Sequence, residues 1–465
     1  MTQAAPSPPP GTHEQFASRW GFLFAAIGSA VGLGNIWRFP FITGENGGGA
    51  FVLLYLVFVV TLGVPALIAM ILIGRRGRQS PINSTQVLAV AEGRGPGWKY
   101  LGWLTVIAAY MALTFFSVVA GWTLDYLVMS ARGLFDGIGA DASEKLFLAV
   151  KADPLRMAFW QGLFMVFTIY IVARGVRQGV ERAVKLMIPA LFVILVLLVA
   201  YGTVTADMGA ALRFMFSPDF SKIGDTNTLL LALGQAFFSL SVGGGGIIAY
   251  GAYMQKEASI TRAAGVIAAA DTIVALLVGL AIFSIVLANG LEPAGGPGLI
   301  FVTLPIAFGH MPGGLFFGTL FFVLVFFAAL STSISMLESL VSWLEEQKGR
   351  TRPAMALASG GLAWIIGLGS VFSFNIWSDV KPLAMFKTFE TATIFRLFDY
   401  FTVNVALPIS AVLITIFVGW VISRRSSREE LNLHRSWMFA AWHAVMRYVA
   451  PIALLAIFIT KLISD

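Results

Sequence analysis

Long apolar runs separated by short polar segments cover most of the chain. A helix needs about 20 apolar residues to span the hydrocarbon core of a bilayer. Eleven runs approach or exceed that length: 17–43, 49–74, 98–130, 157–173, 184–204, 228–254, 261–289, 311–344, 353–373, 391–423 and 437–462. The pattern predicts an all-α polytopic membrane protein with about 11 transmembrane helices.

Basic residues cluster in every second connection between these runs. The clusters are Arg75, Arg76 and Arg78; Arg174, Arg177, Arg182 and Lys185; Lys256 and Arg262; Lys348, Arg350 and Arg352; and Arg424, Arg425 and Arg428. Connections rich in Lys and Arg stay on the cytoplasmic side. We therefore expect a protein of the plasma (bacterial inner) membrane, with its N-terminus in the cytoplasm and its C-terminus outside.

Glycines interrupt two of the runs. Gly28, Gly32 and Gly34 lie in the first run, and residues 243–246, all glycine, lie in the sixth. Because the two runs are five spans apart, they cross the membrane in opposite directions. Such paired interruptions indicate an inverted-repeat transporter with discontinuous helices, whereas close helix packing would explain either stretch taken alone.

Composition supports the membrane assignment and narrows the partners. Of 465 residues, 58% are hydrophobic and only 12% are charged, against about a quarter charged in soluble domains. The net charge is +7, but the basic residues flank membrane spans, so we expect membrane lipid and no nucleic acid as a partner. The chain has no cysteine, which excludes disulfides and thiolate metal sites.

Polar side chains lie in or near the interrupted runs and in runs seven and eight. They are Asn35, Gln235, Ser239, Ser241, Asp271, Ser331, Thr332 and Ser333. Unwound backbone at membrane depth leaves carbonyl and amide groups without partners, and these groups suit a cation such as sodium and an anionic substrate group. Small hydroxyl residues also form interhelical hydrogen bonds, but together with the acid we interpret them as ligands.

Charged residues inside the runs need a partner. Asp271 costs about 2.5–3.5 kcal/mol at the bilayer centre, so we expect it to face a cavity, a cation or a proton path, or to form a structural ion pair with Arg38 or Arg396. Arg38 and Asp399 are expected to form an ion pair above the cavity, although Arg396 shares a helical face with Asp399 and could pair with it instead. Glu338 is expected to be a structural acid near the inner face.

Five motifs resemble the neurotransmitter:sodium symporter family. They are GSAVGLGNIWRFP, GENGGGAF, GQAFFSLSVG, GPGLIFVTLP and FFAALSTSISMLE, in order along the chain. The resemblance implies the leucine-transporter-like fold, an inverted five-helix repeat with broken helices 1 and 6, and the short eleven-helix form of bacterial relatives. The expected divisions are a disordered cytoplasmic tail at 1–15, the first repeat at 16–204, the second at 205–423, and a cytoplasmic loop with the last helix at 424–465.

The resemblance also implies two sodium sites. The first would use the carbonyl of Ala30 and the side chains of Asn35, Ser239 and Asp271. The second would use the carbonyls of Gly28, Val31 and Ala328 and the hydroxyls of Ser331 and Thr332.

The same resemblance places an amino-acid substrate between the interruptions. Its amine would contact the carbonyls of Ala30, Phe238 and Ser239, and its carboxylate would contact the amides of Leu33 and Gly34. Gly32 stands where relatives that carry amines without a carboxylate have Asp, which favours an amino acid. The remaining expected contacts are Ala112, Phe116, Ser241, Gly244, Thr332 and Met336, with Phe238 as a lid beneath Arg38 and Asp399.

Several positions depart from the family pattern. Phe116 replaces a tyrosine that holds the substrate carboxylate, and Met70 replaces a glutamate. Ala112 and Gly244 are small, so the pocket is expected to be roomy and to suit a bulky apolar or aromatic amino acid.

The inner gate also departs from the family pattern. At the inner end the usual Arg and Trp fall on His13 and Phe16, so a gate to Glu346 would depend on His13 or Arg19.

Chloride-using relatives combine residues here matched by Tyr55, Gln235 and Ser239 with a serine that falls on Ala275. Because Asp271 supplies a negative charge one turn away, no strict chloride requirement is expected.

These features predict a sodium-coupled symporter that imports a neutral amino acid by alternating access. Two alternatives remain: a proton-coupled transporter that uses Asp271, and a non-transporting amino-acid sensor, which the substitutions at Phe116, Met70 and Phe16 would allow. The four histidines are scattered and no nucleophile stands beside a base, so no enzymatic activity is expected. The amino acid, the sodium stoichiometry and the oligomeric state stay open.

Overall fold

A computed structural model describes residues 14–217, 223–290, 298–347, 350–433 and 436–464. All regular secondary structure in these residues is helical. The principal helices are α1 (Arg19–Ala30), α2 (Phe39–Glu45), α3 (Gly49–Phe58), α4 (Val64–Gly77), α5 (Pro81–Ala91), α6 (Lys99–Ala131), α7 (Ala140–Ala152), α8 (Pro154–Ala173), α9 (Arg182–Thr205), α10 (Met208–Phe216), α12 (Thr226–Ser239), α13 (Gly245–Ala252), α14 (Ile260–Ala288), α15 (Leu304–His310), α16 (Gly314–Glu345), α17 (Arg352–Phe372), α18 (Ile394–Tyr400), α19 (Leu407–Ile416), α20 (Arg424–Leu431), α21 (Ser436–Ala444) and α22 (Ala450–Ser464).

Helices occupy all eleven predicted spans within the described residues. Nine are continuous and long enough to cross a membrane: Gly49–Gly77, Pro96–Ala131, Pro154–Ala173, Val176–Thr205, Ile260–Ala288, Gly314–Glu345, Arg352–Phe372, Ile394–Val421 and Trp437–Thr460. The first span is a pair of helices, Arg19–Ala30 and Gly34–Glu45, bent by 48°. The sixth is divided into α12 and α13, neither of which is long enough to span alone.

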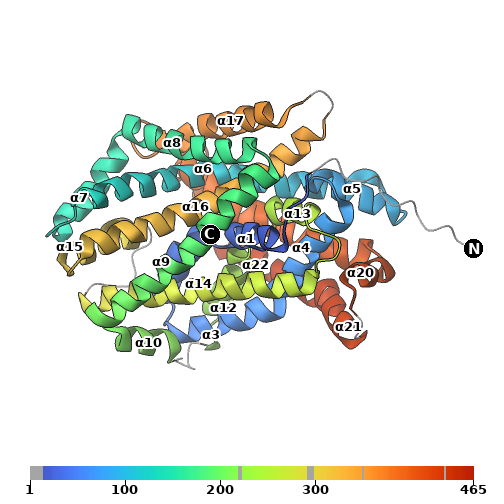
Figure 1. Cartoon of the computed structure of the whole chain (residues 1–465), viewed down its shortest axis with the longest axis horizontal. Helices are drawn as coiled ribbons and strands as arrows, with labels where there is room; N and C mark the ends of the chain where they lie inside the picture. The colour runs from blue at the N-terminus through green and yellow to red at the C-terminus, as the bar shows by residue number, and fades with distance from the viewer. Residues whose placement is uncertain (1–13, 218–222, 291–297, 348–349, 434–435, 465) are drawn as a thin grey trace, which may run out of the picture.

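The long helices run side by side, with the two broken spans at the centre. α1 contacts α9, α13, α14 and α16, and α6 packs along α16, so the first broken helix is enclosed by the bundle (Figure 1). The connecting helices α7, α10 and α15 lie at one end of the bundle, and α5 and α20 lie at the other end. The predicted basic connections fall at this second end.

Polar caps fix where several helices begin. Ser18 accepts a hydrogen bond from the amide of Gly21 at the start of α1, and Asp225 accepts one from Thr228 at the start of α12. Asp153 and Ser423 cap α8 and α20 in the same way. Each oxygen satisfies one of the four amides that a helix start leaves without an intrahelical partner.

Five π-helical turns each end two residues before a proline. The turns are Gly34–Arg38, Val59–Gly63, Leu299–Thr303, Phe401–Ala406 and Val445–Val449, and the prolines are Pro40, Pro65, Pro305, Pro408 and Pro451. Proline lacks an amide hydrogen and clashes with the carbonyl four residues earlier. A widened turn accommodates the ring without ending the helix, which keeps the backbone paired inside the membrane.

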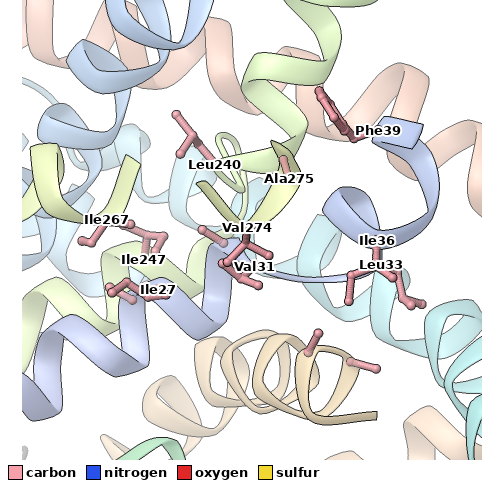
Figure 2. Close-up of a cluster of buried hydrophobic side chains, with 14 of the residues drawn as sticks. Ile27, Val31, Leu33, Ile36, Phe39, Leu240, Ile247, Ile267, Val274 and Ala275 are labelled. Atoms are coloured by element: carbon pink, nitrogen blue, oxygen red, sulfur yellow. The ribbon is translucent and has the colours of Figure 1, made fainter. Parts of the chain in front are cut away.

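The first break lies between Ala30 and Gly34. Val31 is extended, with ψ of 102°, and the helix resumes as a π-helical turn at Gly34. Figure 2 shows the thin connection between the two helical halves, with apolar side chains of neighbouring segments around it. These buried side chains are Ile27, Val31, Leu33, Ile36, Phe39, Leu240, Ile247, Ile267, Val274 and Ala275. The unwound backbone therefore packs against buried apolar side chains.

The second break lies earlier in the chain than the glycine run predicts. Residues 240–244 are non-helical, with Ser241 at φ +53° and Gly243 at φ +96°. A side chain on Gly243 would also clash with the Leu407 carbonyl oxygen, so this glycine is required by both conformation and packing. Gly245 and Gly246, predicted to interrupt the span, are instead the first residues of α13, where Gly246 allows close contact with Ser335 of α16.

Candidate functional site

A cavity of about 530 Å³ lies between the two breaks. Its walls come from both broken spans, from α6 and α16, and from the span that begins with α18. Ten of the eleven predicted substrate contacts line it: Ala30, Leu33, Gly34, Ala112, Phe116, Phe238, Ser241, Gly244, Thr332 and Met336. The eleventh, Ser239, is buried among the polar groups beside it.

Aromatic side chains that the motifs did not identify complete the wall. They are Trp37, Phe41, Phe115 and Phe395. Phe115 immediately precedes Phe116, and Phe395 follows the start of α18. The cavity is therefore mainly apolar, with backbone and hydroxyl groups concentrated at the breaks.

A buried carboxylate lies beside the first break. Asp271 is fully buried in α14, and Asn35 Nδ2 donates to its carbonyl oxygen at 3.0 Å and to Oδ1 at 2.7 Å. Ser239 Oγ donates to Oδ2 of Asp271, and the Tyr55 hydroxyl lies 3.2 Å from Ser239 Oγ. Among the described residues Asp271 forms no ion pair with Arg38 or Arg396, so the predicted structural pair is not what holds it.

Asn35 carries a second oxygen in the same place. Its Oδ1 is buried and has no hydrogen-bond partner among the residues that the structure describes. A buried acceptor without a donor is costly, and a carboxylate with an amide oxygen is the donor set that a hard cation prefers. Asn35, Ser239 and Asp271 therefore fit the predicted sodium site, although they come from three separate spans.

Five oxygens, two from hydroxyls and three from carbonyls, converge near the first break. Thr332 Oγ1 lies 3.2 Å from the Gly28 carbonyl oxygen, 3.4 Å from that of Val31 and 3.1 Å from that of Ala328. Ser331 Oγ donates to the Ala328 carbonyl at 3.1 Å. One hydroxyl hydrogen cannot serve three carbonyls, so acceptors are in excess here, which again suits a cation bound by oxygen ligands.

Hydrogen bonds join the two breaks directly. Ser241 Oγ donates to the Ser29 carbonyl at 2.8 Å, and Ser29 Oγ donates to Ser335 Oγ at 2.9 Å. Gln235 Nε2 donates to the Gly34 carbonyl at 3.0 Å. The unwound segments thus satisfy part of each other's backbone, and the sequence motifs gave no sign of this pairing.

Arg38 covers the cavity. Its guanidinium lies 4.4 Å from the centre of the Phe238 ring, and the exposed Asp399, which lines the same cavity, attracts it electrostatically. Arg396 is exposed. The predicted gating residues Arg38, Asp399 and Phe238 are therefore brought together at one end of the cavity.

The opposite end is closed by the segment before α1. Phe16 is buried, and its ring contacts those of Phe22, Tyr250 and Tyr253. Glu181 accepts hydrogen bonds from the amide of Ala17 at 2.7 Å and from Ser18 Oγ at 2.9 Å. Sequence reasoning missed Glu181, which is about 160 residues away along the chain.

The acids near this end have partners of their own. Glu346 accepts hydrogen bonds from the amide and hydroxyl of Ser80 and from Asn83, at the start of α5. Arg19 is exposed, and His13 lies outside the described residues, so the predicted inner gate at Glu346 stays a prediction.

Glu338 is a structural acid near this end. It pairs with Arg352 and accepts a hydrogen bond from the Tyr253 hydroxyl at 2.6 Å. Met70, which replaces a glutamate of the family pattern, is fully buried in α4.

Known proteins share this architecture. Residues 13–135 and 152–465 match the model of the sodium:neurotransmitter symporter family. An uncharacterized sodium-dependent transporter, YhdH, of Bacillus subtilis (strain 168) is 35% identical over 449 residues, which are 96% of this chain and 97% of that protein. An uncharacterized sodium-dependent transporter of Haemophilus influenzae is 32% identical over 97% of this chain and 98% of its own length.

A solved structure agrees with these relatives. The crystal structure of MhsT in complex with L-phenylalanine superposes with a TM-score of 0.86 at 39% identity, covering 96% of this chain and 99% of MhsT. The family and fold are those of transporters, and the apolar helices make the chain an integral membrane protein. The predicted family and leucine-transporter-like fold are confirmed: the chain belongs to the sodium:neurotransmitter symporter family.

Proposed function

We propose that this protein is a sodium-coupled symporter that imports a bulky apolar or aromatic amino acid by alternating access. The observation that carries the proposal is one apolar cavity bounded by two unwound helices, with oxygen-rich clusters beside it. Sodium use is a property of the family, and L-phenylalanine is bound in the similar MhsT structure. What we propose beyond the family is the kind of amino acid that this protein transports.

Two sodium ions would be carried with each substrate. The first would bind Asp271, Asn35, Ser239 and the Ala30 carbonyl. The second would bind the oxygens of Gly28, Val31, Ala328, Ser331 and Thr332. Each ion that enters down a potential of 100 mV releases about 2.3 kcal/mol before its concentration gradient is counted, which is enough to concentrate a neutral solute.

The substrate would lie with its charged end at the breaks and its side chain among apolar groups. Its carboxylate would meet the amides of Leu33 and Gly34, and its amine the carbonyls of Ala30, Phe238 and Ser239. The side chain would extend toward Phe116, Ala112, Gly244 and Met336. Among the described residues, a β-carbon on Gly244 would meet only the Ser241 carbonyl oxygen, at 3.4 Å, so this wall leaves room for a large side chain.

Alternating access would use the two ends of the cavity. Arg38, Phe238 and Asp399 would close the outer end, and the segment around Phe16 would release at the inner end together with Glu346. We propose that helices of the repeat bundle rock against spans 3, 4, 8 and 9, with the N-terminus in the cytoplasm and no strict need for chloride.

Binding of amino acids to the purified protein tests the proposal. We expect tryptophan, phenylalanine or leucine to raise the melting temperature in sodium but not in potassium at the same pH, with small and charged amino acids inactive. Stabilisation that ignores sodium and follows pH would contradict the sodium sites and favour proton coupling. Sodium-dependent binding without accumulation in sealed vesicles would favour a sensor.

The size of the pocket gives a specific prediction. Gly244→Phe places a ring in the open part of the cavity, so we expect the affinity for the largest substrate to fall at least about tenfold, while a smaller amino acid is less affected. Competition binding with a radiolabelled substrate measures both. Gly265→Phe is the matched control, since a β-carbon there meets no described atom within 4 Å and the residue is exposed on α14. Equal losses in both variants would contradict the placement of the substrate.

A further inference from the structure

A second hollow lies between α20 and α21, two helices near the C-terminal end of the sequence. It has a volume of about 820 Å³. α20 contributes Arg424, Arg425 and Arg428, and the segment at the start of α21 contributes Trp437 and Phe439. Both helices lie at the same end of the bundle as α5 (Figure 1). One wall is therefore basic and the other aromatic.

Two of the three arginines keep their charge available. Arg425 pairs with Glu429 at 2.9 Å. Glu430 points elsewhere, because it pairs with Arg75 and Arg76 at the end of α4. Arg424 and Arg428 have no ion-pair partner within the part of the chain that the structure describes.

Trp420 and Arg447 indicate where this groove lies relative to the end of the membrane span. The span that ends at Val421 carries Trp420 in its last turn, and the Arg447 guanidinium lies 4.0 Å from the centre of that ring. Trp420 Nε1 donates to the Arg447 carbonyl at 3.0 Å. Arg447 is therefore level with the end of the span, where we expect the headgroup region of the membrane to begin.

Arg447 extends the positive region toward the membrane. Its Nε is buried without a hydrogen-bond partner among the described residues. Arg447 and Arg424 both act electrostatically on the buried His443 between them. Trp437 is 65% exposed, and Trp420 and Tyr448 are about half exposed, as aromatic residues are at membrane interfaces.

We propose that the groove between α20 and α21 binds the phosphate of an anionic membrane phospholipid. Arginine presents several donors to phosphate oxygens, and basic pockets beside spanning helices on the cytoplasmic face bind anionic headgroups. The position at the end of the span and the exposed aromatic rings favour a lipid over a free anion, because acyl chains would continue along Trp420 and Tyr448.

Lipid retention in bilayer nanodiscs tests this site. The full-length protein is placed in mixtures of phosphatidylcholine and phosphatidylglycerol, and the phosphatidylglycerol retained is measured by native mass spectrometry. One arginine near the surface changes affinity by about fivefold, so the double variant Arg424→Gln/Arg428→Gln should bind phosphatidylglycerol roughly 25-fold more weakly. Arg424→Lys/Arg428→Lys should recover most of the binding, which separates charge from misfolding.

The control variant has the same loss of charge elsewhere. Arg182→Gln/Arg262→Gln removes two exposed arginines from the expected cytoplasmic side outside the groove, and we expect its retention to match the unmodified protein. Equal weakening in both double variants, or no preference for phosphatidylglycerol over phosphatidylcholine, would overturn the proposal. Displacement of the lipid by millimolar inorganic phosphate would identify a free-anion site instead.

Discussion

Replacing Asp271 with Asn is expected to abolish sodium-dependent uptake. The carboxylate is fully buried in α14, and its neighbours Asn35 and Ser239 are neutral. It is the charge proposed to balance the first sodium ion. Removing one partner of a buried charged contact costs about 2–5 kcal/mol, so the sodium concentration for half-maximal binding should rise at least about thirtyfold. Scintillation proximity binding over a sodium titration measures this change.

The variant should still fold, because a neutral amide fits the site. Asn35 Oδ1 has no hydrogen-bond partner among the described residues, so the Asn35 amide can turn over and accept a hydrogen bond from the new amide, and Ser239 can still donate to the new amide oxygen. Asp379→Asn, at an exposed position, is the matched control and should behave as the unmodified protein. Sodium-stimulated binding that survives in Asp271→Asn would contradict the assignment.

The same experiment separates sodium from proton coupling. If Asp271 carried a proton and no metal, the unmodified protein would accumulate substrate in potassium and its uptake would follow pH. The two mechanisms therefore differ in the unmodified protein, where folding of a variant plays no part.

The sequence predicted the spans and the cavity well for identifiable reasons. Apolar length defines a membrane helix almost alone, and ten of the eleven substrate contacts that the family resemblance predicts lie on the cavity wall. The assignment failed for Gly245 and Gly246, because glycine serves close packing as well as unwinding. The five π-helical turns were not foreseen, although the prolines that follow them were visible in the sequence.

Contacts between distant segments could not be predicted from the chain itself. Glu181 accepts hydrogen bonds from Ala17 and Ser18, and Ser241 donates one to the Ser29 carbonyl. Nothing in the sequence around Glu181 or Ser241 distinguishes either from an ordinary polar residue. These hydrogen bonds depend on how the spans pack against one another. The spacing of residues within one helix does not predict which other helix it will contact.

Thr332→Val is expected to uncouple the second sodium site while keeping the shape of the side chain. Thr332 Oγ1 lies within 3.4 Å of three carbonyl oxygens, and a methyl group there leaves them without a ligand partner. The loss of a charged hydrogen bond or ion contact costs about 1.5–3 kcal/mol, which corresponds to a roughly tenfold to hundredfold rise in the sodium concentration needed for half-maximal uptake. Uptake into proteoliposomes over a sodium titration measures it.

Thr332→Ser is the matched control, because it keeps the oxygen and removes only the methyl group. Its sodium dependence should stay close to that of the unmodified protein, whereas a merely steric role for Thr332 would make serine the more damaging change. The stability of the two variants is expected to differ little, since burial of the valine methyl offsets part of the cost of the unsatisfied carbonyls. A selective loss in valine would therefore assign the oxygen of Thr332 to ion binding, and the convergence of backbone carbonyls at the first break would then be the reason why α1 is broken at Ala30.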